Sequence, residues 1–74
     1  MKYAVIIERD PETGTVGASS PDLEDVFIVG SPGDSDDEML AQFRTSAEAY
    51  VAYLREHGHP LPAPRHHVAM IDVD

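Results

Sequence analysis

Four carboxylates are the first residues in this sequence whose type and position could do chemistry. Glu8 and Asp10 lie at the end of the first predicted strand, Glu48 in the predicted helix and Asp72 in the predicted last strand. Carboxylates that converge from such elements can hold two Mg²⁺ ions for nuclease chemistry. Solvated acids at strand ends and on helix surfaces have the same appearance, and we expect this second role. A metal-dependent nuclease that uses Glu8, Glu48 and Asp72 remains an alternative.

Two other groups of residues could bind a metal ion. Four histidines, at positions 57, 59, 66 and 67, flank a proline-rich stretch. Because His66 and His67 are adjacent, they point to opposite faces of a strand and cannot easily share an ion. The acids of residues 34–38 lack the ligand spacing of a calcium-binding EF-hand loop and are better explained as the start of a helix. We therefore expect no metal and no cofactor.

Alternating apolar residues predict three strands in the N-terminal half of the chain. Residues 2–8 alternate with the period of a strand. Residues 10–14 contain the Pro and Gly of a turn, and residues 15–20 form a weaker second strand, so the two strands are expected to form a hairpin. The apolar run at residues 26–29 predicts a third strand.

The helix is the best-defined element and is predicted over residues 36–57. Ser35 and Glu38 have the spacing of a capping box, in which each side chain bonds the backbone amide of the other residue. Gly58 favours the end of a helix, and Pro60 prevents the helix from continuing. The apolar stripe that should face a sheet consists of Met39, Leu40, Phe43, Ala47, Tyr50, Val51 and Leu54.

The C-terminal part of the chain predicts a connector and a last strand. Residues 59–64 are rich in proline and should form an extended connector, and residues 67–73 alternate as a strand does. The expected fold class is α+β: a two-layer β-β-β-α-β sandwich in which one helix packs on one face of a mixed sheet. Residues 1–74 are expected to form a single domain.

Size and charge restrict the classes of function. With 74 residues, the chain is expected to have only a marginal core. Its net charge is −9, and it contains only five basic residues. Without cysteines no disulfide can compensate, so we expect a homo-oligomer, either a dimer or a tetramer. Direct nucleic-acid binding is disfavoured because it depends on Lys and Arg at phosphates. No apolar run reaches the roughly 20 residues of a membrane helix, and we expect a cytoplasmic protein without membrane contact.

The negative charge is unevenly distributed along the chain. Ten of the 14 acidic residues lie between Glu8 and Glu38, where Arg9 is the only basic residue. Such a distribution can serve solubility alone, or it can attract a basic protein partner.

Several segments, taken in order, resemble the HicB antitoxin family. Residues 1–14 resemble the opening hairpin of that family, and residues 21–23 are similar to its turn before the third strand. Residues 34–40 resemble the start of its helix, and residues 50–62 its helix exit and proline-rich connector. The chain departs from the family at residues 24–26, where Glu-Asp-Val replaces the usual Pro-Gly-Cys. A further departure is what looks like a three-residue insertion, Ser-Pro-Gly, just before the helix.

The resemblance implies a partial ribonuclease-H-like fold that dimerises and is not itself an enzyme. It also implies a partner: a small basic HicA-type toxin that cleaves mRNA and whose RNA-binding surface the antitoxin covers. Many members of the family carry a C-terminal DNA-binding domain, and none is expected here.

On this hypothesis an acidic surface sequesters the toxin and the last strand forms the homodimer. An orphan oligomeric domain without a toxin partner is a further alternative. The predicted partner-binding residues are Asp10, Glu12, Asp22, Leu23, Glu24 and Asp25. The predicted dimer-interface residues are Val68, Met70 and Asp72.

Overall fold

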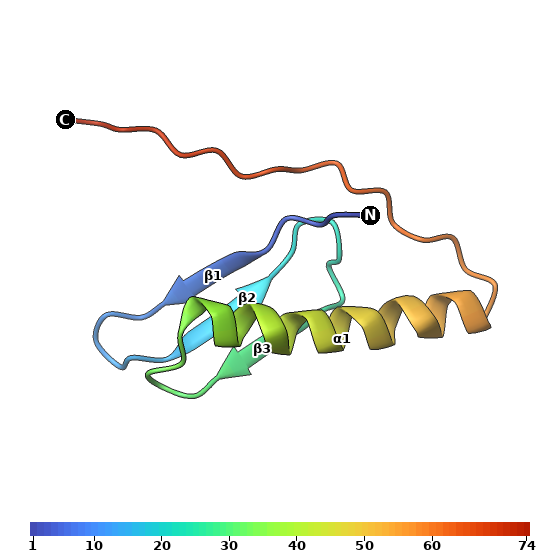
Figure 1. The fold of residues 1–74 in the computed structure, drawn as a ribbon, viewed down its shortest axis with the longest axis horizontal. Helices are drawn as coiled ribbons and strands as arrows, with labels where there is room; N and C mark the ends of the chain where they lie inside the picture. Colours follow the sequence, from blue (N-terminus) through green and yellow to red (C-terminus); the bar gives the residue numbers. More distant parts are fainter.

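A computed structural model describes residues 1–74 and contains one three-stranded antiparallel sheet and one helix (Figure 1). The strands are β1 (Ile6–Arg9), β2 (Val16–Ser19) and β3 (Phe27–Gly30), and they are arranged in the order β1-β2-β3. Because consecutive strands are neighbours and antiparallel, the β1–β2 turn and the β2–β3 loop lie at opposite ends of the sheet. The three predicted N-terminal strands are confirmed.

The turn between β1 and β2 follows from its residue types. The amide of Gly14 donates to the carbonyl of Asp10 at 2.8 Å, and Gly14 has a φ of +76°. Glycine adopts this left-handed conformation without steric cost. The Asp10 carboxylate accepts a hydrogen bond from the amide of Glu12 at 2.9 Å, as is common for Asp in turns.

The single helix, α1 (Asp36–Glu56), begins and ends close to where the sequence predicts. The Glu38 amide donates to Ser35 Oγ at 3.1 Å, and the Ser35 amide donates to Glu38 Oε1 at 3.0 Å, so the predicted capping box is confirmed. After the helix, Gly58 has a φ of +68° and turns the chain away. No helix in this protein combines the length and the apolar character required to cross a membrane.

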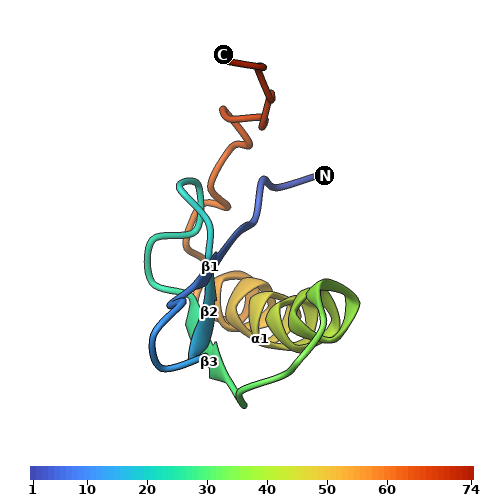
Figure 2. The ribbon, with the colours of Figure 1, turned by 90° about the vertical axis from the view of Figure 1, so that its left-hand side faces the viewer.

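The core lies between the sheet and α1, which covers one face of the sheet (Figure 2). Val16 and Ala18 of β2 point towards the helix, and Met39 and Phe43 pack against them. The α+β class with one helix on one sheet face is therefore confirmed. Only 8 of the 74 residues are buried, which is a small core even for a domain of this size. The core cluster is Val16, Ala18, Leu23, Val26, Met39 and Phe43.

The predicted last strand is the one element that the structure does not form. Residues 59–74 contain no regular secondary structure, and the chain after residue 66 extends away from the body (Figure 1). The observed order is β-β-β-α, and the sheet is wholly antiparallel instead of mixed. Period-two alternation shows only that a segment could be a strand; a strand also needs a neighbouring edge for its hydrogen bonds. Within one chain, residues 67–73 have no such neighbour.

Candidate functional site

The face of the sheet opposite α1 is uncovered, and we call it the outer sheet face. Side chains alternate along each strand, so this face carries the residues that point away from the helix. Three of them are large and apolar: Ile6, Phe27 and Val29, with exposed fractions of 42%, 64% and 67%. The strand register places Ile6, Ser19 and Phe27 in one row and Glu8, Gly17 and Val29 in the next.

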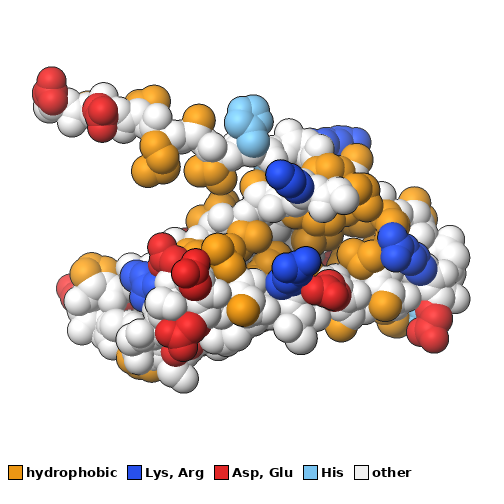
Figure 3. Space-filling view, in the orientation of Figure 1, with side chains coloured by type: hydrophobic (Ala, Val, Ile, Leu, Met, Phe, Trp, Pro, Cys, Tyr) orange, Lys and Arg blue, Asp and Glu red, His pale blue; other side chains and the backbone are white.

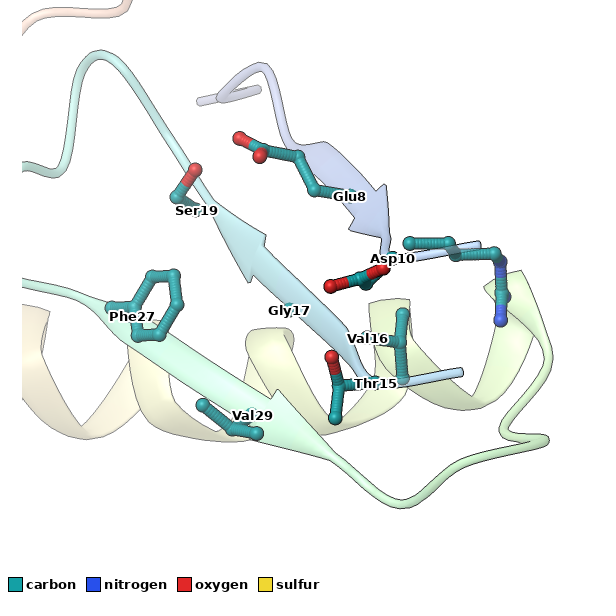
Figure 4. A pocket seen from close by; sticks show the side chains of 9 residues that line it. Glu8, Asp10, Thr15, Val16, Gly17, Ser19, Phe27 and Val29 are labelled. Atoms are coloured by element: carbon teal, nitrogen blue, oxygen red, sulfur yellow. The ribbon is translucent and has the colours of Figure 1, made fainter. Parts of the chain in front are cut away.

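A shallow hollow lies at the centre of the outer sheet face (Figure 4). Its floor is Gly17, which has no side chain, and a Cβ atom placed there would lie 3.2 Å from Cζ of Phe27. Phe27 and Val29 of β3 form the apolar side of the hollow, and Glu8 and Asp10 form the acidic side (Figure 4). The hollow has a volume of about 420 Å³. Its lining residues are Glu8, Arg9, Asp10, Thr15, Val16, Gly17, Ser19, Phe27 and Val29.

The only basic residue at the hollow is already paired. Arg9 Nη2 lies 2.7 Å from Asp36 Oδ1, an ion pair that joins the end of β1 to the start of α1. The carboxylate of Glu8 makes no hydrogen bond or ion pair within the chain. The hollow therefore combines apolar side chains with uncompensated negative charge, a combination suited to a partner with apolar and basic groups.

The end of the sheet at the β1–β2 turn carries five more acids besides Asp10. The β1–β2 turn and the β3–α1 loop lie close together, because a Cβ atom on Gly14 would be 3.8 Å from Cβ of Pro32. Acidic side chains gather over this end of α1 in Figure 3. Several of them have structural roles: Asp34, for example, accepts hydrogen bonds from the Ser31 amide and from Gln42. This acidic end consists of Asp10, Glu12, Asp34, Asp36, Asp37 and Glu38.

The predicted partner-binding residues do not form one surface. Asp10 and Glu12 lie at the acidic end, whereas residues 22–25 lie in the β2–β3 loop at the opposite end of the sheet. Leu23 is only 1% exposed and belongs to the core, so in this arrangement it offers no surface for the predicted contact with a partner. The turn that buries it is closed by hydrogen bonds from the Leu23 amide to Ser20 and from the Val26 amide to Leu23.

Asp22 is also engaged within the chain. Its side chain is 2% exposed, and Oδ1 accepts a hydrogen bond from His66 Nδ1 at 2.7 Å. Oδ2 accepts a second hydrogen bond from the His66 amide at 3.2 Å. Burial raises the pKa of the Asp22 carboxyl, but the hydrogen bonds from His66 and from the Arg65 and His66 amides together hold it below its ordinary value of 3.8. Asp22 therefore fixes the C-terminal part of the chain to the β2–β3 loop.

This contact predicts a release of the C-terminal part of the chain in acid. Because the pKa of Asp22 is lowered in the folded state, its contribution to stability is present above the ordinary value of 3.8 and is lost as the pH falls below it. We expect the amides of Arg65 and His66 to lose protection from hydrogen exchange on acidification below about pH 4, before the core unfolds. In Asp22→Asn these two amides should lose their protection already at neutral pH. The control is Glu24→Gln, a change at an exposed neighbouring residue, which should leave the protection unchanged. Unchanged protection in Asp22→Asn would contradict the contact.

Another residue of the β2–β3 loop forms a hydrogen bond to the helix. The hydroxyl of Tyr50 donates to Oδ2 of Asp25 at 2.9 Å. This hydrogen bond to the carboxylate, together with burial, raises the pKa of Tyr50 above its ordinary value of 10.0. Of the predicted residues in this loop, only Glu24 has a carboxylate without a partner in the chain.

The residues considered for metal chemistry lie apart. Glu8 is on the outer sheet face, Glu48 is on the helix across the sheet and pairs with Arg44 at 3.2 Å, and Asp72 is in the extended C-terminal part. No three His, Asp or Glu side chains are arranged so that they could hold a metal ion. His66 bonds to Asp22, and the His57 and His59 rings stack with their centroids 6.3 Å apart. The three carboxylates of the nuclease alternative therefore do not converge in this structure.

The most informative residues of the hollow were not predicted. Phe27 and Val29 belong to a run of four apolar residues that the sequence assigns to a strand without separating its two faces. One signal was present: Gly17 and Ser19 alternate with the apolar Val16 and Ala18 in the neighbouring strand. A face with such small residues leaves room above it.

Comparison of the chain with protein-family models, with curated proteins and with solved structures gives no match.

Proposed function

We propose that this protein is a binding module of the HicB antitoxin type, which sequesters a small basic protein on the acidic side of its outer sheet face. The observation that carries the proposal is the hollow over Gly17, where exposed Phe27 and Val29 stand opposite Glu8 and Asp10. Exposed apolar side chains rimmed by charge are typical of interaction sites. The ordered resemblance of the sequence to HicB antitoxins supports the nature of the partner.

The acidic side and the apolar side of the hollow have different physical roles. The carboxylates, together with the acidic end, attract a basic partner over a distance and orient it on approach. The apolar side chains then supply the contact energy, because they lose their exposure to water in the complex. A toxin that uses basic residues to hold RNA would lose access to RNA while those residues face this surface.

The first experiment tests the nature of the partner. The protein is co-expressed with the short basic protein encoded beside it, and growth, mRNA integrity and co-purification are measured. We expect the basic protein alone to arrest growth and cleave mRNA, and the complex to do neither. If no such neighbour exists, or if a purified neighbour does not bind, the antitoxin proposal fails and the orphan oligomeric domain becomes the better interpretation.

The second experiment locates the contact by charge. The double variant Glu8→Lys/Asp10→Lys should weaken binding of the basic partner, with a larger effect at low than at high salt because screening already weakens the attraction in salt. The matched control is Glu24→Lys/Asp25→Lys at the opposite end of the sheet, which should leave the affinity within about twofold. Isothermal titration at two salt concentrations measures both. A larger loss of affinity in the control variant would indicate that the partner contacts the β2–β3 loop instead.

A further inference from the structure

The last residues of the chain expose an unusual amount of apolar surface. We call residues 67–74 the C-terminal segment; it is extended and leaves the body beyond the edge of β1 (Figures 1 and 2). Met70, Ile71 and Val73 are 88%, 82% and 81% exposed, and Val68 is 59% exposed. Apolar side chains grouped in this way are normally covered by another surface.

A second apolar surface is uncovered on the flank of α1. The helix packs over β2 and β3, and its other side borders Met1 and Tyr3 near the N-terminus. Met1, Tyr3, Ala47, Val51 and Ala52 form the apolar part of a hollow there, with a volume of about 410 Å³, which we call the helix hollow. Figure 3 shows Lys and Arg side chains around apolar ones on this face.

The charges of the two surfaces are complementary. The chain has a net charge of −9 and only five basic residues, yet Arg44 and Arg55 both border the helix hollow. The C-terminal segment carries Asp72 and Asp74. Glu48 also borders the hollow, where it pairs with Arg44 at 3.2 Å. Even with Glu48 included, the charged side chains that border the helix hollow have a net positive charge, although the protein as a whole is acidic. The helix hollow therefore suits an acidic apolar peptide.

The two surfaces also match in length. From Arg44 to Arg55 a helix rises about 16 Å, at 1.5 Å for each residue. From Val68 to Val73 an extended chain covers about 17 Å, at roughly 3.3 Å for each residue. The four apolar residues of the segment can therefore lie along the whole helix hollow.

Contacts within the chain direct the segment away from its own helix hollow. The hydroxyl of Tyr3 donates to the Pro62 carbonyl at 2.6 Å, so the connector has already passed the N-terminal residues when it reaches Asp22. His66 is then held at Asp22 through two hydrogen bonds. To reach its own helix hollow, the segment would have to turn back directly after this anchor. A second copy of the chain can receive it without such a turn.

We propose that the C-terminal segment of one copy lies in the helix hollow of a second copy, and that the exchange is reciprocal. The resulting dimer covers the exposed apolar residues of both chains and enlarges a core of only seven buried apolar residues. The outer sheet face stays free in this dimer. The proposal is therefore independent of the proposed partner-binding function.

Oligomeric state is the first test. The wild-type protein should sediment as a dimer at micromolar concentration. Ile71→Asp/Val73→Asp should raise the dimer dissociation constant at least about thirtyfold, as expected for loss of buried anchor residues. These residues lie outside the core, so the circular dichroism spectrum should stay unchanged. A monomeric wild-type protein, or a double variant that dimerises as well as the wild type, would overturn the proposal.

Cross-linking distinguishes exchange from a return to the same chain. Because the protein has no cysteine, Ile71→Cys and Val51→Cys each introduce a single thiol near the middle of one surface. When the two variants, one of them tagged, are mixed and oxidised, a disulfide-linked heterodimer should form. Glu12→Cys mixed with Ile71→Cys is the matched control and should not cross-link. A third variant carries both Ile71→Cys and Val51→Cys in one chain. If this variant forms a disulfide within itself at high dilution, and the mixture of single variants gives no heterodimer, the proposed exchange between copies is wrong.

Discussion

Met39→Ala is expected to remove a large part of the stability of this protein. The Met39 side chain is fully buried, with 0% of its surface exposed, and it lies between the sheet and the helix. Truncation of a buried methionine to alanine costs about 2–5 kcal/mol, because apolar contacts are lost and a cavity remains. A domain of 74 residues has a total stability of roughly 4–11 kcal/mol, so the loss is severe.

The surroundings of Met39 contain no side chain that could refill the cavity at low cost. Its sulfur lies against the α-carbon of Gly30, where a Cβ atom would collide with Sδ of Met39. Gly30 has no side chain that could move into the space, and the neighbouring Val16 is itself 2% exposed and held in the sheet. The cost should therefore lie in the upper part of the range for such substitutions.

Urea and thermal unfolding at a fixed protein concentration measure the loss. Leu40→Ala is the matched control, since Leu40 is the next residue of the same helix and is 43% exposed. We expect it to lose less than half as much stability as Met39→Ala. Equal losses in the two variants would contradict the assignment of the core to this side of the helix.

The helix could be predicted closely because its ends depend on local interactions. Ser35 and Glu38 bond each other's backbone amides, and Gly58 takes the left-handed conformation that ends the helix. These contacts involve residues three positions apart or a single φ angle, and sequence spacing shows them directly. Elements with such local signals need no knowledge of the rest of the fold.

The strand ends depend on pairing and were less predictable. The alternation of residues 2–8 predicts a strand from Lys2, yet β1 begins at Ile6, which pairs with Ser19. Beyond Ser19 the chain turns at Pro21, so residues before Ile6 have no neighbour to bond. The missing last strand has the same cause. Alternation indicates which side chains would share one face of a strand, but it does not identify a neighbouring strand that could pair with it.

The candidate site was only partly predictable for a related reason. Of the predicted acids, Asp10 lines the hollow and Glu12 lies in the same turn as Asp10. Leu23, in contrast, was assigned to a contact loop and is in the core. A leucine among acids looks the same in sequence whether it faces a partner or fills the core. Only the turn that joins Ser20 to Leu23 and Leu23 to Val26 decides between them.

Phe27→Ala is expected to weaken partner binding at least about thirtyfold while leaving the fold intact. Phe27 is the largest exposed side chain of the outer sheet face, with 64% of its surface accessible. Aromatic side chains that become buried at the centre of an interface commonly contribute about 2 kcal/mol or more, which is roughly thirtyfold in Kd. Since the ring is already exposed in the free protein, its removal opens no cavity in the core. Tyr53→Ala is the matched control, because Tyr53 is an aromatic residue of 51% exposure on the helix.

Gly17→Val tests the same surface without removing a contact. Valine favours a strand more than glycine does, so the sheet should form at least as well. Its side chain would fill the floor of the hollow, and Phe27, whose Cζ lies 3.2 Å from the added Cβ, can shift outwards because it is exposed. Titration of the basic partner should show that Gly17→Val and Phe27→Ala both bind weakly, whereas Tyr53→Ala binds as the wild type does. If Gly17→Val binds normally, the partner does not enter the hollow. If Tyr53→Ala binds as weakly as Phe27→Ala, the contact involves the helix side, and the outer sheet face loses its role as the binding surface.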